Sequence, residues 1–187
     1  MGFDNDKKNA LYKLRGHDKS NIGAVDRQVR NTVDTINRKK DYYTTSSCAG
    51  RIVILDLGKT SKKSEANFLF RAHSKVVQTD LEKHLADKRN VWFRQEPAIL
   101  HIIARSLDGA SKLLDIARDT GFKHSGIQTM KKRIVVEVRG SEFINAPLHK
   151  NMNLAYQKML VKKANESLEK TRENLTTFTE KITTELS

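Results

Sequence analysis

Short apolar runs alternate with amphipathic helical segments between residues 67 and 138, and this alternation constrains the fold more than any other feature. We predict strands at 67–73, 91–95, 98–104, 125–129 and 133–138, with helices at about 76–88 and from Asp108 to Thr120. Two strand–helix–strand units in this order predict a mixed sheet with flanking helices packed on it. The expected class is α+β, with α/β as the alternative.

The segments on either side complete the expected domain. Residues 5–38 are predicted to be helical with a polar break at 17–23, residues 41–50 to form a polar turn, and residues 51–57 to form a buried strand. Residues 151–187 should be a helical C-terminal extension that frays beyond Leu175. Because 187 residues suit one domain, we expect a single domain over 1–187. The segment Lys170 to Ser187 is polar and almost neutral, so its deletion should leave activity nearly intact.

Net charge gives the first indication of function. Lysine and arginine number 35 against 22 acidic residues, which gives +13 and an isoelectric point near 9.9. From residue 151 onward six basic residues oppose five acidic ones, so residues 1–150 carry +12 of the surplus. Concentrated positive charge attracts polyanions, and nucleic acid is the expected partner. Lys59, Lys62 and Lys63, which follow the strand at 51–57, are predicted to contact phosphates.

The composition predicts a cytoplasmic protein without a metal. No apolar run approaches the ~20 residues that span a bilayer, and the polar, acidic start lacks the pattern of a secretory signal. The single cysteine, Cys48, cannot form an internal disulfide. The sequence has no paired cysteines, no His-x-x-x-His spacing, no glycine-rich nucleotide motif and no Gly-x-Ser-x-Gly element.

One segment gathers reactive groups. Residues 43–51, Tyr-Thr-Thr-Ser-Ser-Cys-Ala-Gly-Arg, place hydroxyls, a thiol, a glycine and an arginine directly before the strand at 51–57. Such a segment can offer backbone N–H groups, hydroxyls and a guanidinium to a carboxylate or a phosphate. On composition alone, an ordinary hydroxyl-rich turn explains it equally well.

Residues 46–56 resemble the Ser-Ser-Cys-x-Gly-Arg signature and following strand of the wybutosine-synthesizing protein 3 family. Further segments follow in family order over about residues 25–150: a strand ending in histidine at 68–73, Glu-Pro-Ala-Ile-Leu-His at 96–101, Gly-Phe-Lys-His-Ser-Gly-Ile at 121–127, and a strand at 133–139 followed by Pro147. Phe68 stands where the family usually has tryptophan, and Ala98 replaces a common phenylalanine.

The resemblance implies an S-adenosylmethionine-dependent tRNA methyltransferase in wybutosine biosynthesis, of the tRNA(Phe) 7-(3-amino-3-carboxypropyl)-4-demethylwyosine N(4)-methyltransferase type. Its substrate is the modified guanosine 3′ of the anticodon, within the anticodon stem-loop of tRNA(Phe). The ring nitrogen that is methylated must lose a proton, and histidine titrates in a suitable range. We expect a monomer that needs neither a metal nor a membrane.

The same resemblance implies the site residues. The expected catalytic residues are His73, His101 and Ser47. The expected contacts to the methyl donor are Ser46, Ser47, Cys48, Gly50, Arg51, Arg105, Ser125 and Gly126. Two alternatives remain open from the residues themselves. A non-catalytic RNA-binding module explains the charge but not the hydroxyl-rich segment, and a hydrolase would use Ser46 or Ser47 as its nucleophile.

Overall fold

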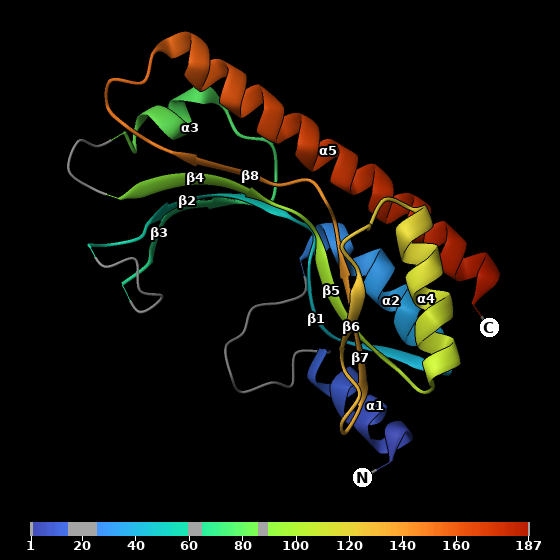
Figure 1. Ribbon diagram of the computed structural model, residues 1–187. Helices are drawn as coiled ribbons and strands as arrows, with labels where there is room; N and C mark the ends of the chain where they lie inside the picture. Colours follow the sequence, from blue (N-terminus) through green and yellow to red (C-terminus); the bar gives the residue numbers. More distant parts are fainter. Residues whose placement is uncertain (1, 15–25, 60–64, 86–89, 187) are drawn as a thin grey trace. The chain divides into compact units, whose positions relative to one another are not determined.

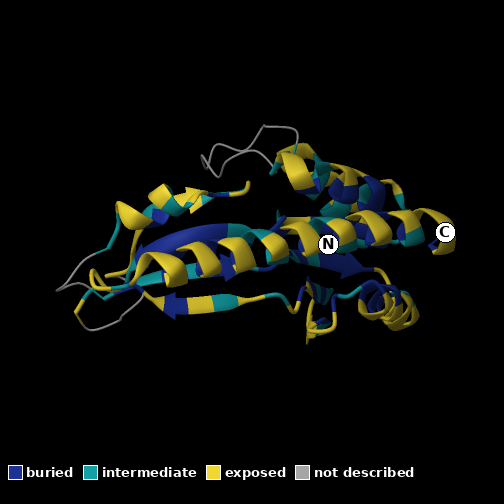
Figure 2. Cartoon of the chain, turned by 90° about the horizontal axis from the view of Figure 1, so that it is seen from above, coloured by how far each residue is buried: buried dark blue, intermediate teal, exposed yellow. Residues whose placement is uncertain are grey.

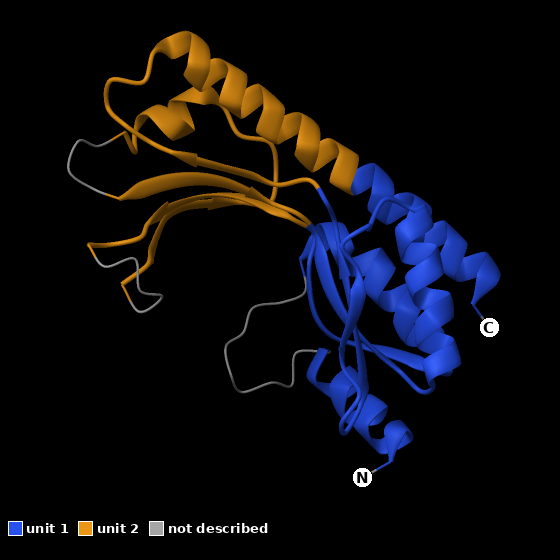
Figure 3. Ribbon diagram, in the orientation of Figure 1, with its two compact units in different colours: residues 1–49, 98–141, 172–187 blue, residues 50–97, 142–171 orange. Residues whose placement is uncertain are grey.

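The chain forms two compact units, each with its own sheet and core. The computed structural model describes residues 2–14, 26–59, 65–85 and 90–186. Unit 1 consists of residues 1–49, 98–141 and 172–187, and unit 2 consists of residues 50–97 and 142–171 (Figure 3). The elements are labelled in Figure 1.

Unit 1 is built on a four-stranded antiparallel sheet in the order β1-β5-β7-β6. Its strands are β1 (Tyr42–Cys48), β5 (Ile99–Ala104), β7 (Ile134–Arg139) and β6 (Gly126–Thr129). Its helices are α1 (Phe3–Tyr12), the 3-10 helix η2 (Arg27–Val29), α2 (Arg30–Arg38), α4 (Leu107–Asp119) and the last part of α5 (Leu154–Glu185).

The two faces of this sheet differ in what covers them. Residues on one face, including Leu100, Ile102 and Val136, pack with α2, α4 and the end of α5 in the unit 1 core. Directly paired residues of neighbouring strands share a face. Because His101 pairs with Glu137 and Ile103 lies two residues further along β5, these side chains belong to the opposite face. We call this the open face of the unit 1 sheet.

Unit 2 has a second four-stranded antiparallel sheet, in the order β3-β2-β4-β8. Its elements are β2 (Arg51–Asp56), β3 (Asn67–Ala72), α3 (Gln78–Glu82), β4 (Val91–Glu96), β8 (Ile144–Pro147) and α5 up to Thr171. Ile52, Ile54 and Phe93 pack on the α5 residues Leu160 and Leu168 in the unit 2 core.

The α+β class predicted from the sequence is confirmed, but the strands lie in two antiparallel sheets instead of one mixed sheet. Both predicted strand–helix–strand units exist as connections. In each, a third strand occupies the position between the two connected strands: β2 lies between β3 and β4, and β7 lies between β5 and β6. The inserted strand makes every neighbouring pair antiparallel, and chain order alone does not reveal the insertion.

Two local predictions differ from the structure. The segment 41–50, expected to be a turn, contains β1, because its threonines suit a strand and β5 provides a complete pairing partner. The short strand β8 was not predicted, since it has four residues and ends in Pro147, which is tolerated at a sheet edge.

Helix α5 does not fray beyond Leu175 as expected; it continues to Glu185. Phe178 and Ile182 are fully buried in the unit 1 core, at the three- and four-residue spacing of a helix face, while the other side of the helix is exposed (Figure 2). Described residues of the segment Lys170 to Ser187, among them Phe178 and Ile182, are therefore part of a core, so we expect its deletion to destabilise unit 1. Although α5 has 32 residues, no helix in the described ranges combines the length and hydropathy needed to cross a membrane.

Phe178→Ala should lower the free energy of unfolding by about 3–5 kcal/mol. The change removes a residue that is 0% exposed and whose ring centroid lies 5.3 Å from that of Phe122. Denaturant titration would measure this loss. Thr177→Ala, an exposed change on the same helix, is the control and should shift stability by less than about 0.5 kcal/mol. Equal stability of the two variants would contradict the assignment of α5 to the core.

Candidate active site

A hydrogen-bonded row of three side chains crosses the open face of the unit 1 sheet. The register of β1 shifts between Thr44 and Ser46, and this irregularity places Ser46 opposite His101. The Ser46 hydroxyl lies 2.8 Å from His101 Nδ1, and His101 Nε2 lies 3.1 Å from Glu137 Oε2. Ser46 is exposed, whereas the Glu137 side chain is 15% exposed. We refer to Ser46, His101 and Glu137 as the relay.

The chemistry of the relay follows from which atoms can donate. An ionised Glu137 only accepts, so the neutral imidazole must carry its proton on Nε2. Nδ1 is then the acceptor, and the Ser46 O–H donates to it. When a group gives a proton to the Ser46 oxygen, the hydroxyl proton of Ser46 can move to His101 Nδ1. Glu137 then stabilises the imidazolium that results. The relay can act as a general base with its entry at an exposed hydroxyl.

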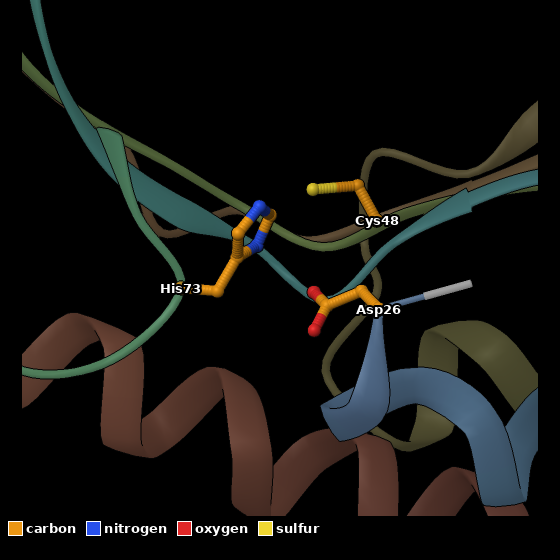
Figure 4. A group of neighbouring side chains, drawn as sticks. All are labelled: Asp26, Cys48 and His73. Carbon is orange, nitrogen blue, oxygen red and sulfur yellow. The ribbon is translucent and has the colours of Figure 1, made fainter. Parts of the chain in front are cut away.

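The turn that follows β1 is fixed through its backbone. The Ala49 N–H donates to the Asp26 carboxylate at 3.2 Å, and the Arg172 guanidinium donates to the Ala49 carbonyl. Burial lowers the pKa of Arg172, while Asp26 and Cys48 act in the opposite direction. Figure 4 shows Asp26 beside the strand end that carries Cys48. Both backbone polar groups of a fully buried residue are thus satisfied by side chains from distant parts of the sequence.

Gly50 continues this turn with a backbone that few other residues adopt. Its φ of 85° lies in the left-handed region, which explains why the signature has glycine at this point. The Gly50 carbonyl lies 3.3 Å from His73 Nδ1, so this histidine binds the backbone of unit 2 through that atom.

Arg51 opens β2 within a polar and aromatic cluster of unit 2. Its Nε donates to Glu96, its cross-strand partner, at 2.6 Å. The Phe68 ring, which is 42% exposed, has the guanidinium of Arg71 4.1 Å and that of Arg51 5.3 Å from its centroid. Guanidinium groups and aromatic rings in this arrangement form a surface that can stack on a planar ligand.

The other predicted site residues fall into different surroundings. Ser47 pairs with Leu100, a core residue, so the structure joins Ser46 and not Ser47 to His101. The Ser125 hydroxyl donates to the Phe122 carbonyl and accepts from the Arg139 N–H, which gives it a local structural role.

Gly126 and Arg105 lie at two different points of the open face. Gly126 pairs with Glu137, and no described atom lies within 4 Å of where its Cβ would be. Arg105 follows β5 and binds Asp4 and Asp41. Among the predicted phosphate contacts, Lys59 is exposed, and Lys62 and Lys63 lie outside the described residues.

The sequence did not reveal four residues that organise these clusters. Glu137 is the middle of a regular strand and Glu96 precedes a proline, so neither pattern marks a functional carboxylate. Asp26 and Arg172 are 23 and 123 residues away from Ala49 in the sequence. The only sequence signal for any of the four was the resemblance of residues 96–101, which include Glu96, to a segment of the family.

Comparison with known proteins identifies the family. The family model "Methyltransferase TYW3" matches residues 5–184. The chain belongs to this family. It is 36% identical to the tRNA(Phe) 7-((3-amino-3-carboxypropyl)-4-demethylwyosine(37)-N(4))-methyltransferase of Thermococcus sibiricus, over 96% of this chain and 94% of that protein. It is 33% identical to the tRNA wybutosine-synthesizing protein 3 homolog of Xenopus laevis, over 88% of this chain and 69% of that protein.

A solved structure agrees with this membership. The PH1069 protein from Pyrococcus horikoshii superposes with a TM-score of 0.87 at 29% identity, over 97% of this chain and 96% of that one. As a member of a methyltransferase family, the chain is an enzyme, which favours the main prediction over the alternative of a non-catalytic RNA-binding module. The family match spans both units, so the relay and the Arg51 cluster both lie in matched sequence.

Asp26→Ala should lower the free energy of unfolding by about 1–3 kcal/mol, because it leaves the buried Ala49 N–H without its acceptor and removes the cap of η2. Thermal unfolding of the full-length protein would measure the loss. Asp34→Ala makes the same charge change at an exposed position of α2 and serves as the control. If both variants unfold at the same temperature, Asp26 does not hold the turn.

Proposed function

We propose that this protein methylates a ring nitrogen of the 4-demethylwyosine base in tRNA(Phe), with S-adenosylmethionine as the methyl donor. The observation that carries the proposal is the match, over nearly the whole of both chains, to a relative whose name states this reaction. The modified base lies beside the anticodon, so we propose the anticodon stem-loop as the bound part of the tRNA. We propose the cytoplasm as the site of the reaction.

The Arg51 cluster supports binding of the methyl donor. S-adenosylmethionine supplies a methyl group that is already activated on a sulfonium, so the enzyme's tasks are alignment and desolvation. The recorded bond of Arg51 to Glu96 uses Nε, and no bond from its terminal amino groups is recorded within the described ranges. Those groups fit the donor's carboxylate, and the exposed Phe68 ring with Arg71 fits a planar adenine.

The relay supports removal of the proton from the acceptor nitrogen. Ser46 receives this proton on its oxygen while its own proton moves to His101 Nδ1, and Glu137 stabilises the imidazolium. His101 is therefore the proposed base, Ser46 its contact with the substrate, and Glu137 the residue that fixes the tautomer. This assignment replaces Ser47 with Ser46 and leaves His73 in a backbone-binding role.

A serine hydrolase also uses a hydroxyl, an imidazole and a carboxylate, but with the opposite connections. In the Ser-His-Asp triad, Nε2 of the histidine faces the serine and Nδ1 faces the carboxylate. Here Nδ1 faces Ser46 and Nε2 faces Glu137, and Ser46 lies within a strand instead of a nucleophile elbow. The relay therefore favours proton transfer over nucleophilic attack.

His101→Gln should reduce kcat for methyl transfer by about 100-fold, because a general base contributes ~10²–10⁴. Glu137→Gln should reduce kcat by about tenfold or more with KM unchanged, because the imidazolium loses the carboxylate that stabilises it. Transfer of a labelled methyl group from S-adenosylmethionine to undermodified tRNA(Phe) is the measurement. A wild-type kcat in Glu137→Gln would show that Glu137 is only structural.

Arg51→Lys keeps the charge but loses the planar fork, so KM for S-adenosylmethionine should rise about tenfold or more, given ~1.5–3 kcal/mol for a charge-assisted hydrogen bond. Calorimetric titration with S-adenosylmethionine would measure the same loss as a binding constant. Arg94→Lys, an arginine of the neighbouring strand that binds Asn145, is the matched control. Wild-type affinity in Arg51→Lys would remove Arg51 from the donor site.

A further inference from the structure

A pocket of about 180 Å³ opens on the open face of unit 1, next to the relay in the direction of the C-terminal end of β5. Its walls come from α1, from the start of β1, from the end of β5, and from the turn between β6 and β7. Four cationic side chains line or border it: Arg105, Lys131, Lys132 and Arg133. Nothing in the proposed reaction uses this pocket.

The cations are of two kinds. Arg105 and Arg133 are held in place by carboxylates, since Arg105 binds Asp4 and Asp41, and Arg133 binds Asp6 at 2.9 Å. Lys131 and Lys132 are exposed, and in the part of the chain that the structure describes no ion pair is recorded for either ammonium group. The pocket therefore combines two fixed guanidinium groups with two lysines that can bind an incoming anion.

Tyr43, which lines the pocket, carries a buried polar group that lacks a partner among the described residues. The Tyr43 side chain is 1% exposed and packs against Phe3, with ring centroids 5.2 Å apart, yet its hydroxyl has no hydrogen-bond partner among the described residues. Burial raises the pKa of Tyr43, so at neutral pH the hydroxyl keeps its proton and can donate it. A buried unpaired hydroxyl is costly, and a bound acceptor would satisfy it.

The pocket and the relay lie on the same face of one sheet. Tyr43 pairs with Ile103, and Ile103 and Arg105 lie two and four residues beyond His101 along the strand direction. At ~3.3 Å per residue these positions are ~7 and ~13 Å from His101. This spacing is that of neighbouring groups along one extended ligand, with a reacting part at the relay and an anionic part at the pocket.

We propose that this pocket binds a backbone phosphate of the RNA substrate, one or two linkages from the nucleotide whose base reacts at the relay. The inference rests on the proposed function for the identity of the RNA. Lys131 and Lys132 neutralise the phosphate, Arg105 and Arg133 border it as preorganised donors, and the Tyr43 hydroxyl donates to a phosphate oxygen. Such a contact sets the register of the strand on the enzyme without reading its sequence.

The test compares full-length Lys132→Glu with Lys112→Glu, an equal charge change at an exposed position of α4. The probe is a fluorescent RNA hairpin with the sequence of the tRNA(Phe) anticodon arm, and Kd is measured over a salt series. Lys132→Glu should weaken binding about tenfold, and it should lower the slope of log Kd against the logarithm of the salt concentration by about one. Lys112→Glu should have neither effect. Equal effects of the two variants would overturn the pocket assignment.

Tyr43→Phe supplies a second, independent readout. It should weaken binding of the hairpin about two- to tenfold while leaving the melting temperature of the free protein unchanged or higher, because the lost hydroxyl has no partner in the described part of the free protein. A lower melting temperature with unchanged Kd would mean that the hydroxyl serves the fold and would count against the proposal.

Neutral methylphosphonate linkages identify the phosphate itself. Each linkage around the target guanosine is replaced in turn. Replacement of one linkage should weaken hairpin binding by the wild type but not by Lys132→Glu. Additive losses of binding at every linkage would refute a specific contact. Methyl transfer is assayed with the same wild-type preparation. If wild type shows the linkage effect but transfers no methyl group, the proposed function fails and the phosphate pocket stands. If it transfers methyl groups and shows no linkage effect, the pocket fails alone.

Discussion

The pairing register of β1, β5 and β7 is the constraint on which the candidate chemistry depends. An antiparallel ladder fixes which residues stand opposite one another, and here it aligns Ser46, His101 and Glu137 in one row. Because side chains alternate between faces, a slip of one residue would turn His101 into the core and bring Leu100 out. The packed face of the sheet thereby enforces the geometry of the polar face.

The elements that sequence reasoning predicted well are those whose pattern is local. The strand at 51–57 and the helix ending at Gly121 are present, since a β-branched run and a glycine at φ 93° carry their own signal. The hydroxyl- and cysteine-containing segment was predicted to be a turn, whereas most of it forms strand β1. Whether each of those residues touches a ligand stays a prediction.

What could not be predicted depends on contacts between distant residues. Thr45 looks no different in sequence from its neighbours, yet the irregular register around it decides that Ser46 and not Ser47 faces His101. Asp26 and Arg172 read as ordinary surface charges until the fold brings both to the backbone of Ala49. In the same way, the threonine-rich end of the chain hides Phe178 and Ile182, because apolar residues spaced along one helix face are diluted in the linear sequence.

The Tyr43 hydroxyl carries an evolutionary consequence. Selection for a folded chain alone would favour phenylalanine at this position, since the ring packs on Phe3 either way and the oxygen, which lacks a partner among the described residues, only penalises the free protein. Proteins retain such suboptimal groups where function requires them, and the proposed phosphate contact would place stability and activity in conflict at this residue. A designer who stabilised this enzyme by repairing its buried polar defects would begin at Tyr43, and would thereby select against the bound state.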